Sequence, residues 1–187
     1  MSKKKDFLIV VDMQNDFVDG SLGTAEAVSI VDPAAERIRS FDGEILYTMD
    51  THGADYLSTQ EGKNLPVEHC IEGTDGWKLA PAVRHALAQR GAAGEDRCVR
   101  KGTFGSKDLP RRILDVTGGE EPASITLIGL CTDICVISNA MLLKAFFPEV
   151  PIRVDPSACA GVTPKSHEEA LSCMRCCQIA TGEGSGN

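Results

Sequence analysis

The sequence predicts a single α/β domain with three layers, in which helices cover both faces of a mainly parallel sheet. Short runs of strand-forming residues alternate with helical patterns, which favours parallel βαβ units over a hairpin protein. The 187 residues are enough for one domain with its own core, and they contain no internal repeat and no Ser- or Pro-rich linker. We therefore expect one domain over 1–187, with flexible ends at 1–5 and 181–187.

The predicted elements alternate between strand and helix along the chain. Five strands are expected, at residues 7–11, 44–48, 98–100, 125–129 and 152–154. Five helices are expected between and after them, at residues 33–40, 77–90, 106–115, 133–147 and 164–178. Asp32 followed by Pro33 is a typical helix start, and so is Thr163 followed by Pro164. Residues 50–76 form the longest segment without a pattern, and such a loop in a compact domain is usually functional or disordered.

The charge and hydropathy of the chain argue against several classes of protein. Subtracting 27 acidic from 19 basic residues gives a net charge of −8, so no overall field attracts nucleic acid or an anionic membrane. No apolar run reaches the ~18 residues of a spanning helix. The apolar run after Lys5 is too short for a signal peptide, because it ends at Asp12. We expect a cytoplasmic protein that binds neither nucleic acid nor membrane.

The chain holds eight cysteines, and without a secretory signal these favour reduced thiols over a disulfide framework. The densest group is Cys173, Cys176 and Cys177, in a segment whose periodicity places Cys177 with Met174 on the apolar side of a helix. We expect this group to pack against the core. A zinc or redox half-site is the alternative, although no second Cys-x-x-Cys pair follows.

Four chemically reactive side chains follow the predicted strands. Asp12 comes directly after the first strand, and Asp50 follows the second after one intervening residue. Lys101 comes directly after the third strand, and Cys135 lies in the first turn of the helix after the fourth. In open parallel sheets the ligand crevice lies outside the carboxyl ends of the strands. Each residue alone has an ordinary explanation, because Asp and Lys are common in loops. Together they predict one catalytic site, provided that the strands are neighbours.

Cys135 is the predicted nucleophile of this site. A thiol attacks as the thiolate, and a helix N-terminus or a cation such as Lys101 lowers its pKa. Asp12 could take the thiol proton and return it to a leaving amine. The backbone N–H groups of Cys131 and Cys135 could form an oxyanion hole for a tetrahedral intermediate. The alternative is that Cys135 is simply a small buried hydrophobe.

The unpatterned segment also offers metal ligands. It contains Asp50, His52, Glu61 and His69, and two imidazoles with one or two carboxylates suit Zn²⁺, Fe²⁺ or Mn²⁺. Asp50 and His52 can point to one side of an extended segment, whereas the other two depend on the path of the loop. Solvated polar side chains are the alternative explanation. The remaining histidines, His85 and His167, are expected to face solvent from helices.

Three blocks of sequence, "LIVVDMQNDFVDG", "VRKGTFGS" and "GLCTDICV", resemble the isochorismatase-like cysteine hydrolases, which include the nicotinamidases. The resemblance covers the chain from about Phe7 to the last predicted helix, with the blocks in the family's order. It implies an isochorismatase-like fold and a catalytic triad of Asp12, Lys101 and Cys135. It also implies a cis peptide bond between Leu130 and Cys131.

The nicotinamidase branch of this family supplies an expectation for the metal and the pocket. It carries an Asp-x-His pair and a later His, which Asp50, His52 and His69 match, and Glu61 would fill the variable ligand position. The resemblance implies one divalent transition metal, with Zn²⁺ preferred to Fe²⁺ or Mn²⁺. The branch that hydrolyses isochorismate lacks these ligands, so they argue against that substrate.

The substrate pocket shows one departure from the nicotinamidase pattern. Phe17 matches an aromatic residue of the first block, and Phe17 and Leu130 are expected to line the pocket. Nicotinamidases commonly place a second aromatic residue shortly before the last metal histidine, where this chain has Leu65 in "NLPVEH". Tyr56 or Trp77 could supply the missing ring, although both Phe17 and Trp77 could instead belong to the core. The departure weakens the assignment of nicotinamide without weakening that of an amidase.

Taken with the resemblance, the residues predict a metal-assisted amidohydrolase that converts nicotinamide to nicotinate and ammonia through a thioester on Cys135. Lys101 would stabilise the thiolate and fix Asp12. A hydrolase of the same family acting on another small amide, carbamoyl or ureido substrate is the nearest alternative. A non-catalytic metal or redox sensor is a further one, although such a protein has no need of the whole triad. The resemblance also implies a homo-oligomer.

Overall fold

The computed structural model describes residues 4–182, and its centre is a six-stranded parallel sheet in the order β3-β2-β1-β4-β5-β6. The strands are β1 (Asp6–Val11), β2 (Glu44–Asp50), β3 (Cys98–Lys101), β4 (Ser124–Leu130), β5 (Ile152–Ala160) and β6 (Ala180–Thr181). Every pairing between them is parallel. The predicted α/β class and the five predicted strands are confirmed.

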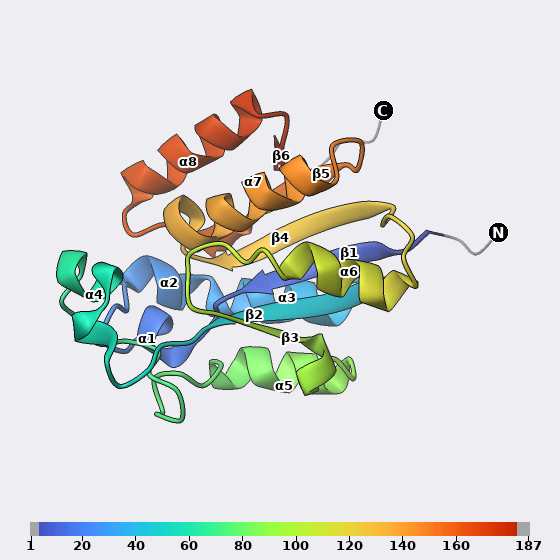
Figure 1. Ribbon diagram of the computed structural model, residues 1–187. Helices are drawn as coiled ribbons and strands as arrows, with labels where there is room; N and C mark the ends of the chain where they lie inside the picture. Colours follow the sequence, from blue (N-terminus) through green and yellow to red (C-terminus); the bar gives the residue numbers. More distant parts are fainter. Residues whose placement is uncertain (1–3, 183–187) are drawn as a thin grey trace.

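Helices cover both faces of this sheet, as Figure 1 shows. The longer helices are α3 (Val31–Ser40), α5 (Pro81–Gln89), α6 (Leu109–Thr117), α7 (Ile137–Phe146) and α8 (Pro164–Cys176). Helix α3 packs against α5, while α7 packs against both α6 and α8. Because both faces are covered, β1 is buried from Phe7 to Val11 and reads as one continuous apolar run.

Several short elements have no clear signal in the sequence. They are α1 (Asn15–Val18), α2 (Ala25–Ser29), α4 (Gln60–Asn64), and the 3-10 turns η1 (Tyr56–Ser58) and η2 (Glu95–Arg97). Elements of three to five residues are too short to be stable alone and depend on tertiary contacts. The segment 50–76 is therefore not a structureless loop, because it contains η1 and α4.

Helix starts differ from the predictions in instructive ways. Helix α8 begins as predicted, with Thr163 as N-cap and Pro164 at the first position, and Ser166 completes a capping box. In α3 the predicted cap Asp32 is wrong, because the helix already begins at Val31 and Ile30 is the N-cap. The helix predicted at 133–147 starts with one π-helical turn, η3 (Thr132–Val136), before α7.

The ends of the chain and its cysteines correct two further expectations. Thr181 belongs to β6, so the flexible segment predicted at 181–187 is wrong at that residue, while 1–3 and 183–187 lie outside the described residues. All eight cysteines are free. The prediction that Cys173, Cys176 and Cys177 pack inside is wrong: all three are exposed, and the buried side of α8 is formed by Ala170, Leu171 and Met174. Within residues 4–182, no helix has the length and apolar character needed to cross a bilayer.

Candidate active site

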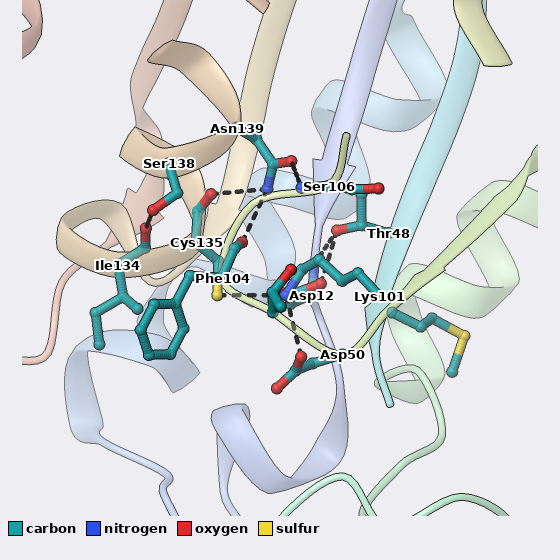
Figure 2. A network of polar contacts seen from close by, with 12 residues as sticks. Asp12, Thr48, Asp50, Lys101, Phe104, Ser106, Ile134, Cys135, Ser138 and Asn139 are labelled. Carbon is teal, nitrogen blue, oxygen red and sulfur yellow. Dashed lines mark hydrogen bonds and ion pairs between the residues drawn. The ribbon is translucent and has the colours of Figure 1, made fainter. Parts of the chain in front are cut away.

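The carboxyl ends of β1, β2, β3 and β4 bring together the four reactive side chains that follow these strands. Lys101 lies at the centre: its Nζ is 2.6 Å from Asp12 Oδ2, 3.2 Å from Asp50 Oδ1 and 3.5 Å from Cys135 Sγ. Figure 2 shows these side chains converging. The sheet order explains the meeting, because β1 lies between β2 and β4, and Asp50 pairs in register with Lys101 on β3. The condition that the strands be neighbours is met.

Asp12 is held by a neighbour that sequence analysis missed. Its backbone is in the left-handed region, with φ of 45°, which Asp tolerates better than most residues. The Thr48 hydroxyl donates to Asp12 Oδ1 at 2.7 Å, and the Asp12 N–H donates back to Thr48 Oγ1 at 3.2 Å. Both side chains are fully buried. A threonine inside the apolar run of β2 was the available signal.

Burial controls the protonation of this site. Removal from water raises the pKa of Asp12, and the charge of Lys101 only partly opposes that effect. Burial disfavours the charged form of Lys101, but the surrounding anions outweigh it and its pKa is raised. The pKa of the Cys135 thiol is raised well above its ordinary value by burial and then by Asp12, with Lys101 acting in the other direction. The net direction is therefore opposite to the lowering expected from Lys101, although Lys101 itself acts as expected.

The turn that carries Cys135 has an unusual backbone. The peptide bond between Leu130 and Cys131 is cis, as the family resemblance implies. The Cys131 carbonyl accepts the N–H groups of Ile134 at 3.1 Å and Val136 at 3.0 Å, and the second of these closes the π-helical turn. Cys135 is 4% exposed, and both cysteines line the pocket described below.

Asn139 is a second residue that sequence analysis missed. Its Nδ2 donates to the carbonyls of Cys135 at 2.8 Å and Phe104 at 3.2 Å, and its Oδ1 accepts the Ser106 N–H at 2.9 Å. These bonds join the nucleophile's helix to the loop that follows Lys101, as Figure 2 shows. The side chain is fully buried. A polar residue four positions after Cys135 was a signal, because it lies one helical turn further on the same face.

The four predicted metal ligands also form one cluster. Their nearest ligand atoms all lie within 4.8 Å of one another. His52 Nε2 is 3.0 Å from Asp50 Oδ2 and 3.8 Å from Glu61 Oε1. His69 Nε2 is 3.6 Å from that Asp50 oxygen and 3.7 Å from the same Glu61 oxygen. Glu61 reaches the cluster because it stands on α4, an element that the sequence did not predict.

The donor set fits a divalent transition metal. Ligands about 2.1 Å from an ion lie roughly 3.0–3.4 Å apart in octahedral or tetrahedral geometry. The four separations given above span 3.0–3.8 Å, so small side-chain movements would bring the donors to an ion. His69 Nδ1 lies 2.8 Å from the Val67 carbonyl, a bond in which that nitrogen donates and which leaves Nε2 free to bind a metal. The two imidazoles are fixed further by Tyr56, whose ring centroid is 4.7 Å from that of His52 and 4.9 Å from that of His69.

A cavity of about 190 Å³ joins the ligand cluster to the nucleophile. Asp50, Glu61 and His69 line one part of it, and Cys131 and Cys135 line another. The remaining walls are apolar: Phe17, Leu22, Leu65, Phe104, Ile134 and Val162. One small molecule in this cavity would contact both the thiol and the metal ligands.

The structure assigns the remaining candidates for the pocket and surface. Phe17 lines the cavity as expected, whereas Leu130 is fully buried and is not among the lining residues. The second aromatic wall is Phe104 rather than Tyr56 or Trp77. His85 is exposed, as predicted. The expectation that His167 faces solvent is wrong, because it is half-buried and its Nδ1 lies 2.8 Å from the Thr132 hydroxyl.

Comparison with known proteins identifies the group to which this site belongs. The family model described as the isochorismatase domain matches residues 6–183. The chain belongs to the isochorismatase family. In fold it is similar to the nicotinamidase/pyrazinamidase PncA from Bacillus subtilis, with 27% identity and a TM-score of 0.80 over 96% of this chain and all of that one. The family resemblance stated from the sequence is confirmed.

Two other solved structures extend the comparison. The pyrazinamidase of Pyrococcus horikoshii in complex with zinc is 26% identical, with a TM-score of 0.76 over 96% of this chain and 99% of that one. The N-carbamoylsarcosine amidase from Thermoplasma acidophilum is 25% identical, with a TM-score of 0.72 over 97% of this chain and 99% of that one. Membership of this family, together with the likeness to these amidases, makes the chain an amidohydrolase.

Proposed function

We propose that this protein is a metal-assisted cysteine amidohydrolase whose leading substrate is nicotinamide. The observation that carries the proposal is the single cavity lined by both Cys135 and the metal-ligand cluster. A thiol, a buried ion pair and a metal site that meet in one small pocket suit attack on a carboxamide beside a ring nitrogen. The likeness to nicotinamidases supports the same substrate.

The protein residues divide the chemistry as follows. Asp12, held by Lys101 at 2.6 Å, takes the proton from the Cys135 thiol as the sulfur attacks the amide carbon. Lys101, 3.5 Å from the sulfur, stabilises the negative charge that develops there and holds Asp12 in place. The backbone N–H groups of Cys131 and Cys135 stabilise the oxyanion of the tetrahedral intermediate.

Collapse of the intermediate breaks the carbon–nitrogen bond. Asp12 returns the proton to the departing nitrogen, so ammonia leaves and the acyl group stays on Cys135 as a thioester. Asp12 then takes a proton from the attacking water, which adds to the thioester carbonyl. The carboxylic acid departs and the thiol regains its proton.

Asp50, His52, Glu61 and His69 would hold the metal. When bound there, Zn²⁺, Fe²⁺ or Mn²⁺ would supply a Lewis-acid centre with coordination positions open to water or to a ring nitrogen. Asp50 also contacts Lys101, so the metal cluster and the ion pair share one carboxylate. This shared residue links occupancy of the metal site to the position of the Lys101 ammonium.

An amidase for another small amide, carbamoyl or ureido compound is the second candidate. Leu65 stands where nicotinamidases commonly have an aromatic residue, and four of the six apolar wall residues are aliphatic. The likeness to an N-carbamoylsarcosine amidase supports this class of substrate. A non-catalytic sensor is not supported, because the triad residues are buried and in contact.

The test is ammonia release from nicotinamide by purified protein, after chelation and again after addition of Zn²⁺, Fe²⁺ or Mn²⁺. We expect metal-dependent release that is lost in Cys135→Ala and retained in Cys173→Ala, a matched change at an exposed thiol. Full activity in Cys135→Ala would reject the mechanism. A folded, metal-loaded protein that releases no ammonia from nicotinamide but does so from carbamoyl or ureido compounds would select the second candidate.

A further inference from the structure

His167 contacts the turn that carries the nucleophile without lining the substrate cavity. It lies in the first part of α8, and its Nδ1 is 2.8 Å from the hydroxyl of Thr132, the first residue of η3. Thr132 is fully buried, and within residues 4–182 His167 is the hydrogen-bond partner that the structure gives its hydroxyl. An imidazole that touches the nucleophile's turn but not the cavity can influence the reaction only through that turn.

The start of α8 is fixed firmly enough to act as a support. Thr163 and Ser166 form a reciprocal capping box, and the His167 N–H donates to the Thr163 carbonyl at 3.0 Å. The chain just before α8 passes so close to the helix that a Cβ on Gly161 would lie 2.8 Å from His167 N. The backbone of His167 is therefore held in place by the capping box and by the close approach of Gly161.

A second bond joins the same two segments. The Val162 N–H donates to the Asp133 carboxylate, at 3.1 Å from Oδ1 and 3.4 Å from Oδ2. Consecutive residues of the turn, Thr132 and Asp133, are thus held by His167 in α8 and by Val162 just before that helix. Two contacts fix an orientation, whereas one would permit rotation about it.

We propose that His167 is a positioning residue that holds the turn from Cys131 to Cys135 in the orientation in which its N–H groups meet the substrate oxyanion. The inference rests on the proposed function. Oxyanion stabilisation depends on donors placed at the final position of the charge, and small displacements of such groups are costly. The bond to Thr132 survives either arrangement of protons, because a hydroxyl donates to a bare Nδ1 and accepts from a protonated one.

The experiment compares variants that keep or remove this bond. His167→Leu removes it, whereas His167→Asn keeps a polar atom near the place of Nδ1. Thr132→Val removes the hydroxyl, and Thr132→Ser retains it. His85→Leu is the matched control, because His85 is exposed on α5, away from the turn. The readouts are kcat and KM for nicotinamide with the metal-loaded enzyme, and the thermal unfolding midpoint of each variant.

We expect His167→Leu to lower kcat about tenfold with KM nearly unchanged, and His167→Asn to recover most of the loss. Thr132→Val should lower kcat similarly, and the double variant His167→Leu/Thr132→Val should be no slower than the slower single variant, because both remove one interaction. Wild-type kcat in a folded His167→Leu variant would overturn the inference, as would losses that multiply in the double variant. If His167→Leu does not fold, the comparison of Thr132→Val with Thr132→Ser tests the inference instead. Equal kcat values in these two variants would contradict it.

A second readout separates this inference from the proposed substrate. Acylation by p-nitrophenyl acetate, corrected for the rate that remains in Cys135→Ser, measures attack by Cys135 on a carbonyl without any amide. If wild-type protein acylates but releases no ammonia from nicotinamide, the proposed substrate is wrong and the role of His167 is still read from acylation. If His167→Leu acylates as fast as wild type, the inference is wrong whatever the substrate.

Discussion

Replacing Asn139 by Ala tests how the nucleophile's helix is joined to the loop after Lys101. The substitution deletes the two bonds that Nδ2 donates, to the carbonyls of Cys135 and Phe104, and the one that Oδ1 accepts from Ser106. Asn139 is fully buried and Ser106 is 4% exposed, so water is not readily available as a replacement partner. The change removes a connection at the centre of the site while leaving every proposed catalytic residue in place.

The size of the effect follows from the three bonds. A hydrogen bond contributes about 1 kcal/mol net, and a buried group left without a partner costs about 1–3 kcal/mol. Three lost bonds therefore predict that the free energy of unfolding falls by about 3 kcal/mol. This is a large part of the roughly 5–15 kcal/mol that holds a domain folded. With a urea dependence of about 3 kcal/mol per molar, the unfolding midpoint should fall by about 1 M.

Urea unfolding followed by circular dichroism measures this shift, and the chain provides a matched control. Asn64 Nδ2 donates to the carbonyl of Gln60, four residues earlier, as Asn139 Nδ2 does to Cys135. Asn64 is exposed and, among residues 4–182, its side chain bonds only to Gln60 in its own helix, so Asn64→Ala should change the midpoint by less than about 0.3 M. Equal shifts in the two variants would refute the argument that Asn139 joins the two segments.

Three further predictions concern the sheet, the thiol and the pocket wall. Gly129→Ala should lower the free energy of unfolding by about 3 kcal/mol or more, measured by thermal melting, because φ is +117° and a Cβ would lie 2.1 Å from the Val11 carbonyl oxygen. In metal-free enzyme, alkylation of Cys135 by iodoacetamide, followed by peptide mass spectrometry, should be slow at neutral pH and still slow at about pH 8.5, where an ordinary thiol is half ionised. The pKa of that thiol is raised, so Asp12→Asn should move the profile to lower pH, and a profile flat from pH 6 upward would contradict this. Phe104→Ala should raise KM for nicotinamide about tenfold with kcat little changed, which corresponds to about 1.4 kcal/mol of lost binding energy. The control Phe146→Ala, at an exposed phenylalanine on α7, should leave KM unchanged. An unchanged KM would show that Phe104 is no wall of the pocket.

The triad was accessible from the sequence because each residue follows a strand. In a parallel sheet all carboxyl ends lie at one edge, so residues at strand ends approach one another once the strands are neighbours. The meeting of Asp12, Lys101 and Cys135 could therefore be predicted once their strands were assumed to be neighbours. The metal ligands Asp50, His52 and His69 were recognisable by type and by the family pattern, whereas Glu61 depended on α4, a five-residue helix without a sequence signal.

Residues that position other side chains or segments could not be predicted from the sequence in the same way. Thr48, Asn139 and His167 look like ordinary strand and helix residues. Apart from the local bond of Asn139 to Cys135, the hydrogen-bond partners cited for them lie 33 to 36 residues away in the chain. The protonation of the site was also misjudged. The residue types suggested that Lys101 lowers the pKa of Cys135, but complete burial and the Asp12 carboxylate outweigh it.

The sequence by itself determined the α/β class, the family and the chemical types that meet in the site, because strand periodicity and motif order are properties of the linear chain. The tertiary structure alone decided which side chains touch: the contact of His167 with Thr132, the wall formed by Phe104, and the exposure of Cys177. The physical reason is that burial and hydrogen bonding depend on neighbours brought from distant parts of the chain. Those neighbours set the pKa of Cys135 and the orientation of its turn, and no local pattern encodes them.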